Sequence, residues 1–141
     1  MKRTLIALLV LTLAVGSLAF VAYAQQKDTG KVKMIMIRSD TITPKTATID
    51  KGTTVIWVNT TSGGVNIFFS KGREIEAVCA APSRFALDNE QKYNSGDIPQ
   101  GGTASVCFLE AGKYEYDVAR SKTAGGATKG TIIVRMTAGQ Q

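Results

Sequence analysis

The sequence GKYEYDVARSKTAGGATKGTIIV, residues 112–134, decides the fold. Tyr114, Tyr116 and Val118 alternate with acidic residues, which is the period-two pattern of a strand with one buried face. A loop rich in glycine, lysine and threonine follows, and residues 131–135 form a β-branched run typical of a strand. The stretch therefore predicts two strands joined by a loop near the end of an all-β domain.

The most strand-like segment lies earlier, at residues 53–59, TTVIWVN. Val55 and Trp57 fall on one face of this segment, with Asn59, whereas Ile56 falls on the other. A strand that is apolar on both faces suits the centre of a sheet in a β-sandwich.

Three further strands complete the expected sandwich. Residues 31–38 alternate between an apolar and a mixed face, and residues 103–109 follow a glycine-rich turn. Residues 41–50 contain Pro44, which cannot donate a hydrogen bond to a neighbouring strand and therefore predicts a bend or a sheet edge before a short strand.

These segments resemble the cupredoxins, the Greek-key copper proteins that include plastocyanin. In that family Lys-Gly-x-x-Val-x-Trp-Val-Asn precedes the first copper ligand, and Tyr-x-Tyr-x-Cys-x-x-His contains two more. Residues 51–59, KGTTVIWVN, and residues 114–118, YEYDV, stand in the same register here. The resemblance covers about residues 32–69 and 98–135, and it implies a Greek-key β-sandwich.

The resemblance also shows which residues stand where the family has its copper ligands. Val65 and Ser121 occupy the two histidine positions, Val118 the cysteine position and Thr128 the methionine position. A type 1 copper ion needs a thiolate, two imidazoles and a weak axial thioether, and the chain has no histidine at all. The sequence therefore predicts no type 1 copper site and no cofactor.

A different copper site is the alternative. Met34 and Met36 share one face of the first strand, and thioethers suit Cu(I). Flexible methionine side chains also fill gaps in protein cores, and the alternation of faces favours core packing for both residues.

The region between the two matching parts, residues 70–97, is predicted to be a partly helical insertion that covers an edge or end of the sandwich. Residues 73–81 have apolar side chains at helical spacing before a proline. Residues 83–91 predict a second short helix, with Phe85 and Leu87 facing the body of the domain.

Two cysteines divide between the insertion and the strand after it. In an exported protein an even number of cysteines predicts a disulfide, here between Cys79 and Cys107. Closing a loop of this length would stabilise the fold by about 3–4 kcal/mol in the chain-entropy model. Two separate buried thiols and a metal-binding role are the alternatives.

The beginning of the chain has the composition of a signal peptide, residues 1–24. Lys2 and Arg3 precede an apolar run at residues 5–20, and Ala-Tyr-Ala ends at Ala24. The run is short for a membrane anchor, which is the competing interpretation. Cleavage after Ala24 predicts an exported protein, periplasmic or extracellular, with no membrane span.

The remaining chain predicts one cupredoxin-like domain at residues 31–136. Residues 25–30 and 137–141 are expected to be flexible. The formal charge of +6 falls to +4 when the two cations of the signal peptide are removed. No basic stripe with interleaved aromatic residues accompanies this charge, so nothing in the sequence indicates nucleic-acid binding.

The prediction of function rests on the catalytic motifs that the sequence lacks and on the charged loop that it contains. Without histidine, and without a nucleophile or phosphate-binding motif, the sequence does not indicate an enzyme. Arg120, Lys122 and Lys129 surround a glycine pair at the loop 120–129 end and predict contact with an acidic protein partner or a small anionic ligand, although a solvated loop is the alternative. Asn59 begins a glycosylation acceptor motif. The predicted function is a binding or structural module, with a copper carrier or electron-transfer protein that uses non-standard ligands as the alternative.

Overall fold

The structure is a computed structural model that describes residues 31–121 and 126–136. The predicted signal peptide and the two ends that the sequence predicts to be flexible lie outside these residues. The strands are β1 (Val32–Ile37), β2 (Ile42–Thr43), β3 (Thr46–Asp50), β4 (Thr53–Asn59), β5 (Val65–Phe69), β6 (Cys79–Ser83), β7 (Ala86–Leu87), β8 (Tyr93–Ile98), β9 (Thr103–Phe108), β10 (Gly112–Arg120) and β11 (Thr128–Arg135). One helix, α2 (Gly72–Val78), lies between β5 and β6. Among the described residues no helix is long and apolar enough to cross a membrane.

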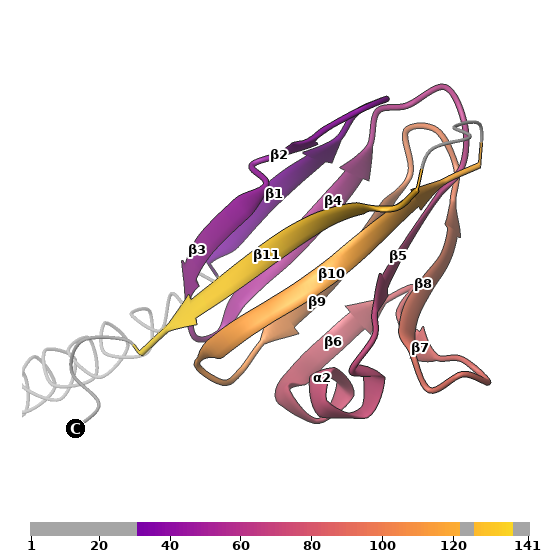
Figure 1. Cartoon of the computed structure of the whole chain (residues 1–141). Helices are drawn as coiled ribbons and strands as arrows, with labels where there is room; N and C mark the ends of the chain where they lie inside the picture. The colour runs from indigo at the N-terminus through magenta and orange to yellow at the C-terminus, as the bar shows by residue number, and fades with distance from the viewer. Residues whose placement is uncertain (1–30, 122–125, 137–141) are drawn as a thin grey trace, which may run out of the picture.

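Two sheets form the sandwich (Figure 1). The five-stranded sheet has the order β2-β1-β4-β9-β6, and the six-stranded sheet has the order β3-β11-β10-β5-β8-β7. Buried side chains from both sheets form one core. This confirms the predicted all-β sandwich with a partly helical insertion.

The central strand β4 behaves as its sequence predicts. It pairs with β1 in parallel and with β9 in antiparallel orientation, and every second residue from Thr53 to Asn59 is buried. Trp57 is completely buried and contacts Phe69 and Tyr116 edge to face, with ring centroids 6.2 and 5.4 Å apart. Aromatic pairs of this geometry add stability beyond the area they bury, so they hold the two sheets together around Trp57.

The strand pair β10 and β11 confirms the pattern of residues 112–134. Tyr116 and Val118 are buried, and Tyr116 lies directly opposite Gly130 on β11. An added Cβ at Gly130 would overlap the Tyr116 ring, so glycine leaves the space that this ring occupies. The Tyr114 hydroxyl donates a hydrogen bond to the Glu110 carbonyl at 3.0 Å, which is the contact of a tyrosine corner.

The insertion is less helical than predicted. The helix ends at Val78, where the chain becomes extended at Cys79, and the predicted second helix is wrong. Ala81 and Arg84 adopt positive φ angles of 46° and 72°, which interrupt helical geometry, and β6 and β7 form by pairing with β9 and β8. Phe85 is nevertheless buried in the core, as predicted, and β6 covers an edge of β9.

The prediction that both methionines pack in the core is wrong for Met34. Its side chain is 56% exposed, Met36 is partly buried, and Ile35 and Ile37 fill the core instead. Because β1 is rich in apolar residues on both faces, its alternation does not indicate which face turns inward. Ile35 is paired with the buried Trp57 of β4, and this pairing shows that the face of β1 with Ile35 and Ile37 turns inward.

The predicted disulfide is absent, and Cys79 and Cys107 are free thiols. Cys79 is paired with Phe108 of β9, whereas Cys107 is paired with Ala80 of β6. Successive side chains of a strand point to opposite faces, so Cys79 faces the core beside buried Phe108 and Cys107 faces outward.

Candidate functional site

Three adjacent strands bring the ligand-equivalent residues to one end of the six-stranded sheet. Val118 of β10 is paired with Thr128 of β11, and Val65 of β5 lies opposite Arg120 on the other side of β10. The backbone N–H and the hydroxyl of Ser121 both donate to the carbonyl of the residue before Val65, each at 3.0 Å. We call the region formed by Val65, Val118, Ser121 and Thr128 the ligand-equivalent pole.

The two valines of the ligand-equivalent pole belong to the core. Val65 is 1% exposed and Val118 is fully buried. Their methyl groups carry no lone pair, so they occupy volume at these positions and offer nothing to a metal ion. Apolar burial here stabilises the sandwich by about 0.8 kcal/mol for each methylene-sized group.

The two hydroxyl residues already have protein partners. Ser121 donates its hydroxyl to the Gly64 carbonyl, and the Thr128 hydroxyl accepts a hydrogen bond of 2.7 Å from Nη1 of Arg120. Both groups are therefore part of the hydrogen bonding that joins β5, β10 and β11.

Arg120 makes further contacts across this end of the molecule. Its Nε donates to the Arg38 carbonyl at 2.8 Å and its Nη2 to the Thr41 carbonyl at 3.1 Å. Both carbonyls belong to the turn between β1 and β2, so the guanidinium connects the five-stranded sheet to Thr128 in the six-stranded sheet. Burial lowers the pKa of Arg120, with Asp40 acting in the opposite direction, and the arginine stays a cation at neutral pH.

These contacts change the interpretation of the predicted partner site. Arg120 uses its donors within the protein, which no sequence pattern indicated because the accepting carbonyls lie about 80 residues away. Lys129 forms an ion pair of 3.3 Å with Asp117, and Lys122 lies outside the described residues. Contact of this end with an anionic partner stays a prediction.

Asn59 shapes the loop that leads to Val65. Its side-chain NH₂ donates to the carbonyls of Gly63 and Ile98, each at 2.8 Å, and its Oδ1 accepts from the backbone N–H and the hydroxyl of Thr61. Asn59 is fully buried, so the folded protein does not offer its amide for glycosylation. The buried amide instead fixes residues 60–64 without any metal ion.

The residues present at the ligand-equivalent pole do not fit a type 1 copper ion. Such an ion takes a thiolate, two imidazoles and a thioether, and this pole has two hydrocarbon side chains and two hydroxyls. Residues 31–121 and 126–136 contain no group of three or more His, Cys, Asp or Glu side chains that could hold a metal. Both cysteines lie on β6 and β9 of the other sheet.

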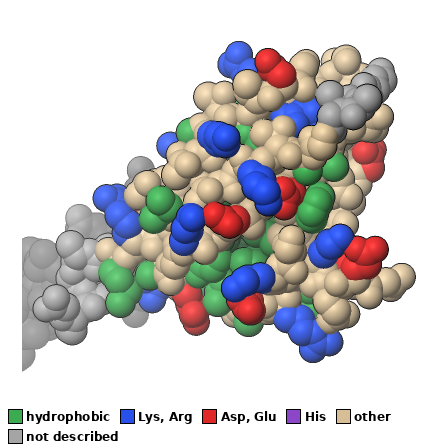
Figure 2. Space-filling model, viewed as in Figure 1, with side chains coloured by type: hydrophobic (Ala, Val, Ile, Leu, Met, Phe, Trp, Pro, Cys, Tyr) green, Lys and Arg blue, Asp and Glu red, His purple; other side chains and the backbone are tan. Residues whose placement is uncertain are grey.

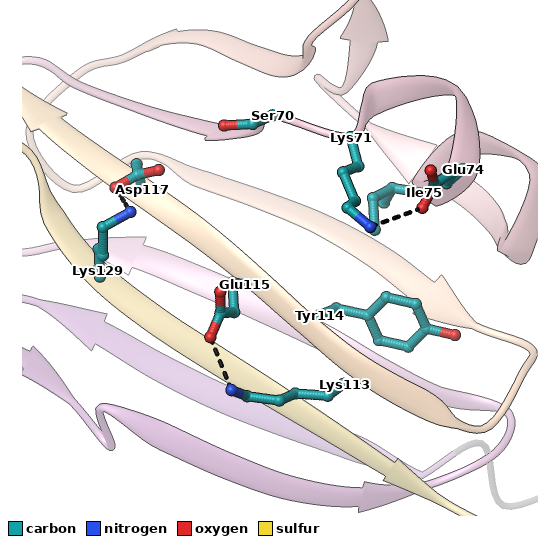
Figure 3. A pocket seen from close by; sticks show the side chains of 9 residues that line it. All are labelled: Ser70, Lys71, Glu74, Ile75, Lys113, Tyr114, Glu115, Asp117 and Lys129. Atoms are coloured by element: carbon teal, nitrogen blue, oxygen red, sulfur yellow. Dashed lines mark ion pairs between the residues drawn. The ribbon is translucent and has the colours of Figure 1, made fainter.

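A separate groove of about 380 Å³ lies on the outer face of the six-stranded sheet, beside α2 (Figure 3). Its charged side chains form three ion pairs, namely Lys71 with Glu74 at 3.4 Å, Lys113 with Glu115 at 2.7 Å and Lys129 with Asp117 at 3.3 Å. Figure 2 shows basic and acidic side chains interleaved over this face. Because each of these charges has an opposite neighbour, the groove has no excess of one sign to select a ligand.

Comparison with known proteins places this geometry in context. A family model described as copper-binding proteins of the plastocyanin/azurin family matches residues 36–135. Among solved structures, a mutant of amicyanin in its Cu(I) form is 20% identical with a TM-score of 0.51, covering 79% of this chain and 88% of that one. Amicyanin from Paracoccus versutus is 22% identical with a TM-score of 0.50, covering 79% and 87%. The chain has no match among curated protein sequences.

Proposed function

Because the chain belongs to the plastocyanin/azurin family of copper-binding proteins, we propose that it is an exported cupredoxin-fold protein without a type 1 copper site. It acts as a binding or structural module and is not an enzyme. The leader-like residues 1–24 support export, and the lack of histidine supports a role outside acid–base catalysis.

One observation carries the proposal. Val65 and Val118, which stand where the family has a histidine and its cysteine, are buried and fill the ligand-equivalent pole with hydrocarbon. The guanidinium of Arg120 adds a cation that already binds three oxygen atoms there. A second cation at this end would meet electrostatic repulsion from the first, and none of the four ligand-equivalent side chains offers it an anionic ligand.

Metal analysis of the purified protein tests the proposal. After incubation with Cu(II) and removal of excess metal, we expect substoichiometric copper and no intense thiolate-to-copper band in the visible spectrum. Stoichiometric copper accompanied by that band would refute the proposal.

Restoring the ligands tests the convergence of the four positions. The variant Val65→His, Val118→Cys, Ser121→His and Thr128→Met supplies the donor set that the family uses, and we expect it to bind Cu(II) with a thiolate-to-copper band. The matched control keeps Val118 and carries the other three changes, so it lacks the thiolate and should show no such band. A folded four-residue variant without the band would mean that these positions do not converge as their strand pairing indicates.

A copper carrier is the second candidate function, and the exposure of Met34 favours it. Met34 and Met36 lie two residues apart on the outer face of β1, where their thioethers can approach one Cu(I) ion. Competition with a Cu(I) chelator is the direct test. Removal of copper from the chelator by the parent protein, lost in Met34→Leu, would favour the carrier over the metal-free module.

A further inference from the structure

One edge of the five-stranded sheet is only partly covered. The strand β2 pairs with Met36 and Ile37 alone, and after Thr43 the chain crosses to the six-stranded sheet, where β3 lies beside β11. No other described strand pairs with residues 32–35 on that side. An edge of this kind presents unpaired N–H and C=O groups that can bind another extended chain.

The side chains along this edge are apolar and exposed. Val32 is 59% exposed and Met34 is 56% exposed, and both point to the outer face of the sheet. The neighbouring outward positions of β4 and β9 are also uncharged, comprising Thr54, Ile56, Val58, Thr103, Ser105 and Cys107. Exposed apolar side chains beside an uncharged strand face provide a surface that another apolar chain can cover.

The inward side of the same edge carries positive charge. A depression of about 340 Å³ lies between β1 and β3, with Lys31 and Lys33 on its β1 side and Arg135 opposite. Asp50 neutralises part of this charge, since it lies 2.7 Å from Lys31 and 3.2 Å from Arg135. In the described part of the chain Lys33 has no ion pair.

A buried hydroxyl also lacks a partner at this depression. Thr53 contributes to its lining and is 3% exposed, and its Oγ1 has no hydrogen-bond partner among the described residues. Buried polar groups in folded proteins are nearly always hydrogen-bonded, so this hydroxyl is an unsatisfied polar group in the lining of the depression.

We propose that the open edge of β1, residues 32–35, binds an extended segment of another protein in which apolar residues alternate with acidic ones. Such a segment would add as a strand beside β1. Because alternate side chains of a strand point to opposite faces, its apolar residues would cover Val32 and Met34, and its carboxylates would face Lys33 and the depression. The inference gives the binding role proposed above a surface and a partner chemistry.

A second copy of this chain is a poorer occupant. Two β1 edges paired around a two-fold axis would bring Lys31 and Lys33 of both copies to one seam. Like charges at neighbouring positions destabilise strand pairing. Charge complementarity therefore favours an acidic partner.

The experiment uses the purified protein and a fluorescently labelled peptide of about seven residues that alternates valine and glutamate. We expect a saturable increase in anisotropy that weakens with salt. Lys33→Glu should weaken binding by about tenfold or more. Met34→Pro should also weaken it, because proline removes an edge N–H but is tolerated on edge strands. The matched control Lys113→Glu reverses a charge on the other sheet and should bind as the parent does.

Amide chemical shifts locate the complex. Changes centred on residues 32–35 that appear with peptide, together with the expected losses in Lys33→Glu and Met34→Pro, would support the proposal. No saturable binding, equal binding of a valine–lysine peptide, or shifts centred elsewhere would overturn it. Shifts in residues 32–35 that depend on protein concentration without peptide would also overturn it, in favour of a second copy. If the peptide does not bind but the protein remains copper-free, this inference fails and the proposed metal-free module stands.

Discussion

Replacement of Arg120 by methionine should destabilise the fold although Arg120 is partly exposed. The change keeps an unbranched aliphatic side chain and removes hydrogen bonds to the Arg38 carbonyl, the Thr41 carbonyl and the Thr128 hydroxyl. A hydrogen bond to a charged group contributes about 1.5–3 kcal/mol. Because water reaches the two carbonyl contacts, we expect a total loss of about 2 kcal/mol in the free energy of unfolding and not the sum of three such bonds.

Urea unfolding followed by tryptophan fluorescence measures this loss. Trp57 is the only tryptophan and is fully buried between the sheets, so its emission reports the global transition. With a slope of about 1.5 kcal/mol per molar urea, a loss of about 2 kcal/mol lowers the midpoint by about 1.3 M. Arg120→Lys keeps the positive charge but lacks the planar guanidinium group, so its urea midpoint should lie between those of the parent and Arg120→Met.

Arg38 provides the matched control. Its exposed side chain makes no hydrogen bond or ion pair in the described ranges, and Arg38→Met retains the backbone carbonyl that accepts from Arg120. We expect Arg38→Met to change the free energy of unfolding by less than about 0.5 kcal/mol. Equal losses in Arg38→Met and Arg120→Met, or no loss in Arg120→Met, would refute the view that the guanidinium holds this end of the sandwich together.

Three other substitutions test the core and the closing strands by the same urea assay. Gly130→Ala should lower the free energy of unfolding by about 1–3 kcal/mol, because the added Cβ would overlap the Tyr116 ring. The control Gly126→Ala should be nearly neutral, because its Cβ meets no atom within 4 Å. Similar losses in the two variants would contradict the packing of Tyr116 against Gly130. Tyr114→Phe should cost about 1 kcal/mol through loss of the 3.0 Å hydrogen bond to the carbonyl four residues upstream, and an unchanged midpoint would mean that this corner contributes nothing. Burial, with a smaller effect of the second thiol, raises the pKa of Cys79 from 9.0 to about 12. The folded state therefore favours the protonated thiol more than the unfolded chain does. The stability that Cys79 contributes is fully present below about pH 9, the pKa in the unfolded chain, and is lost as the pH rises toward about 12, the pKa in the folded state. Cys79→Ala should therefore lose less stability than the parent between about pH 8 and pH 10.5, and parallel pH profiles would argue against the raised pKa.

The fold was predictable because its long strands are determined by local pattern. The alternation around Trp57 and along residues 114–118 reports burial directly, and the structure buries Trp57, Tyr116 and Val118 and partly buries Tyr114. The pattern is insufficient where both faces of a strand are apolar, as around Met34, because burial then depends on the pairing partner. It is also insufficient at residues 79–87, where helical spacing loses to two positive φ angles and to pairing with β9 and β8.

The candidate site was predictable in position but not in its interactions. The alignment of this sequence with the cupredoxin motifs predicted that Val65 and Val118 lie at one end of the domain. The pairing of β10 with β5 and β11 places them there. The role of Arg120 depends on carbonyl groups of a distant turn, and backbone oxygens have no signature in a sequence. The two cysteines show the same limitation, since the predicted export favours a disulfide, whereas the structure has two free thiols on opposite faces of the sheet that contains β6 and β9.

The shape of the ligand-equivalent pole follows from interactions that do not involve a metal. The buried amide of Asn59 holds residues 60–64 by hydrogen bonds at both of its polar ends, and this loop delivers Val65 to β5. Arg120, the last residue of β10, connects the turn between β1 and β2 to Thr128 on β11. The geometry of this end of the scaffold does not depend on a bound ion, because neither set of contacts requires one. If the ligand-restored variant binds copper, the same contacts explain why four substitutions suffice, since the protein itself already places the four side chains.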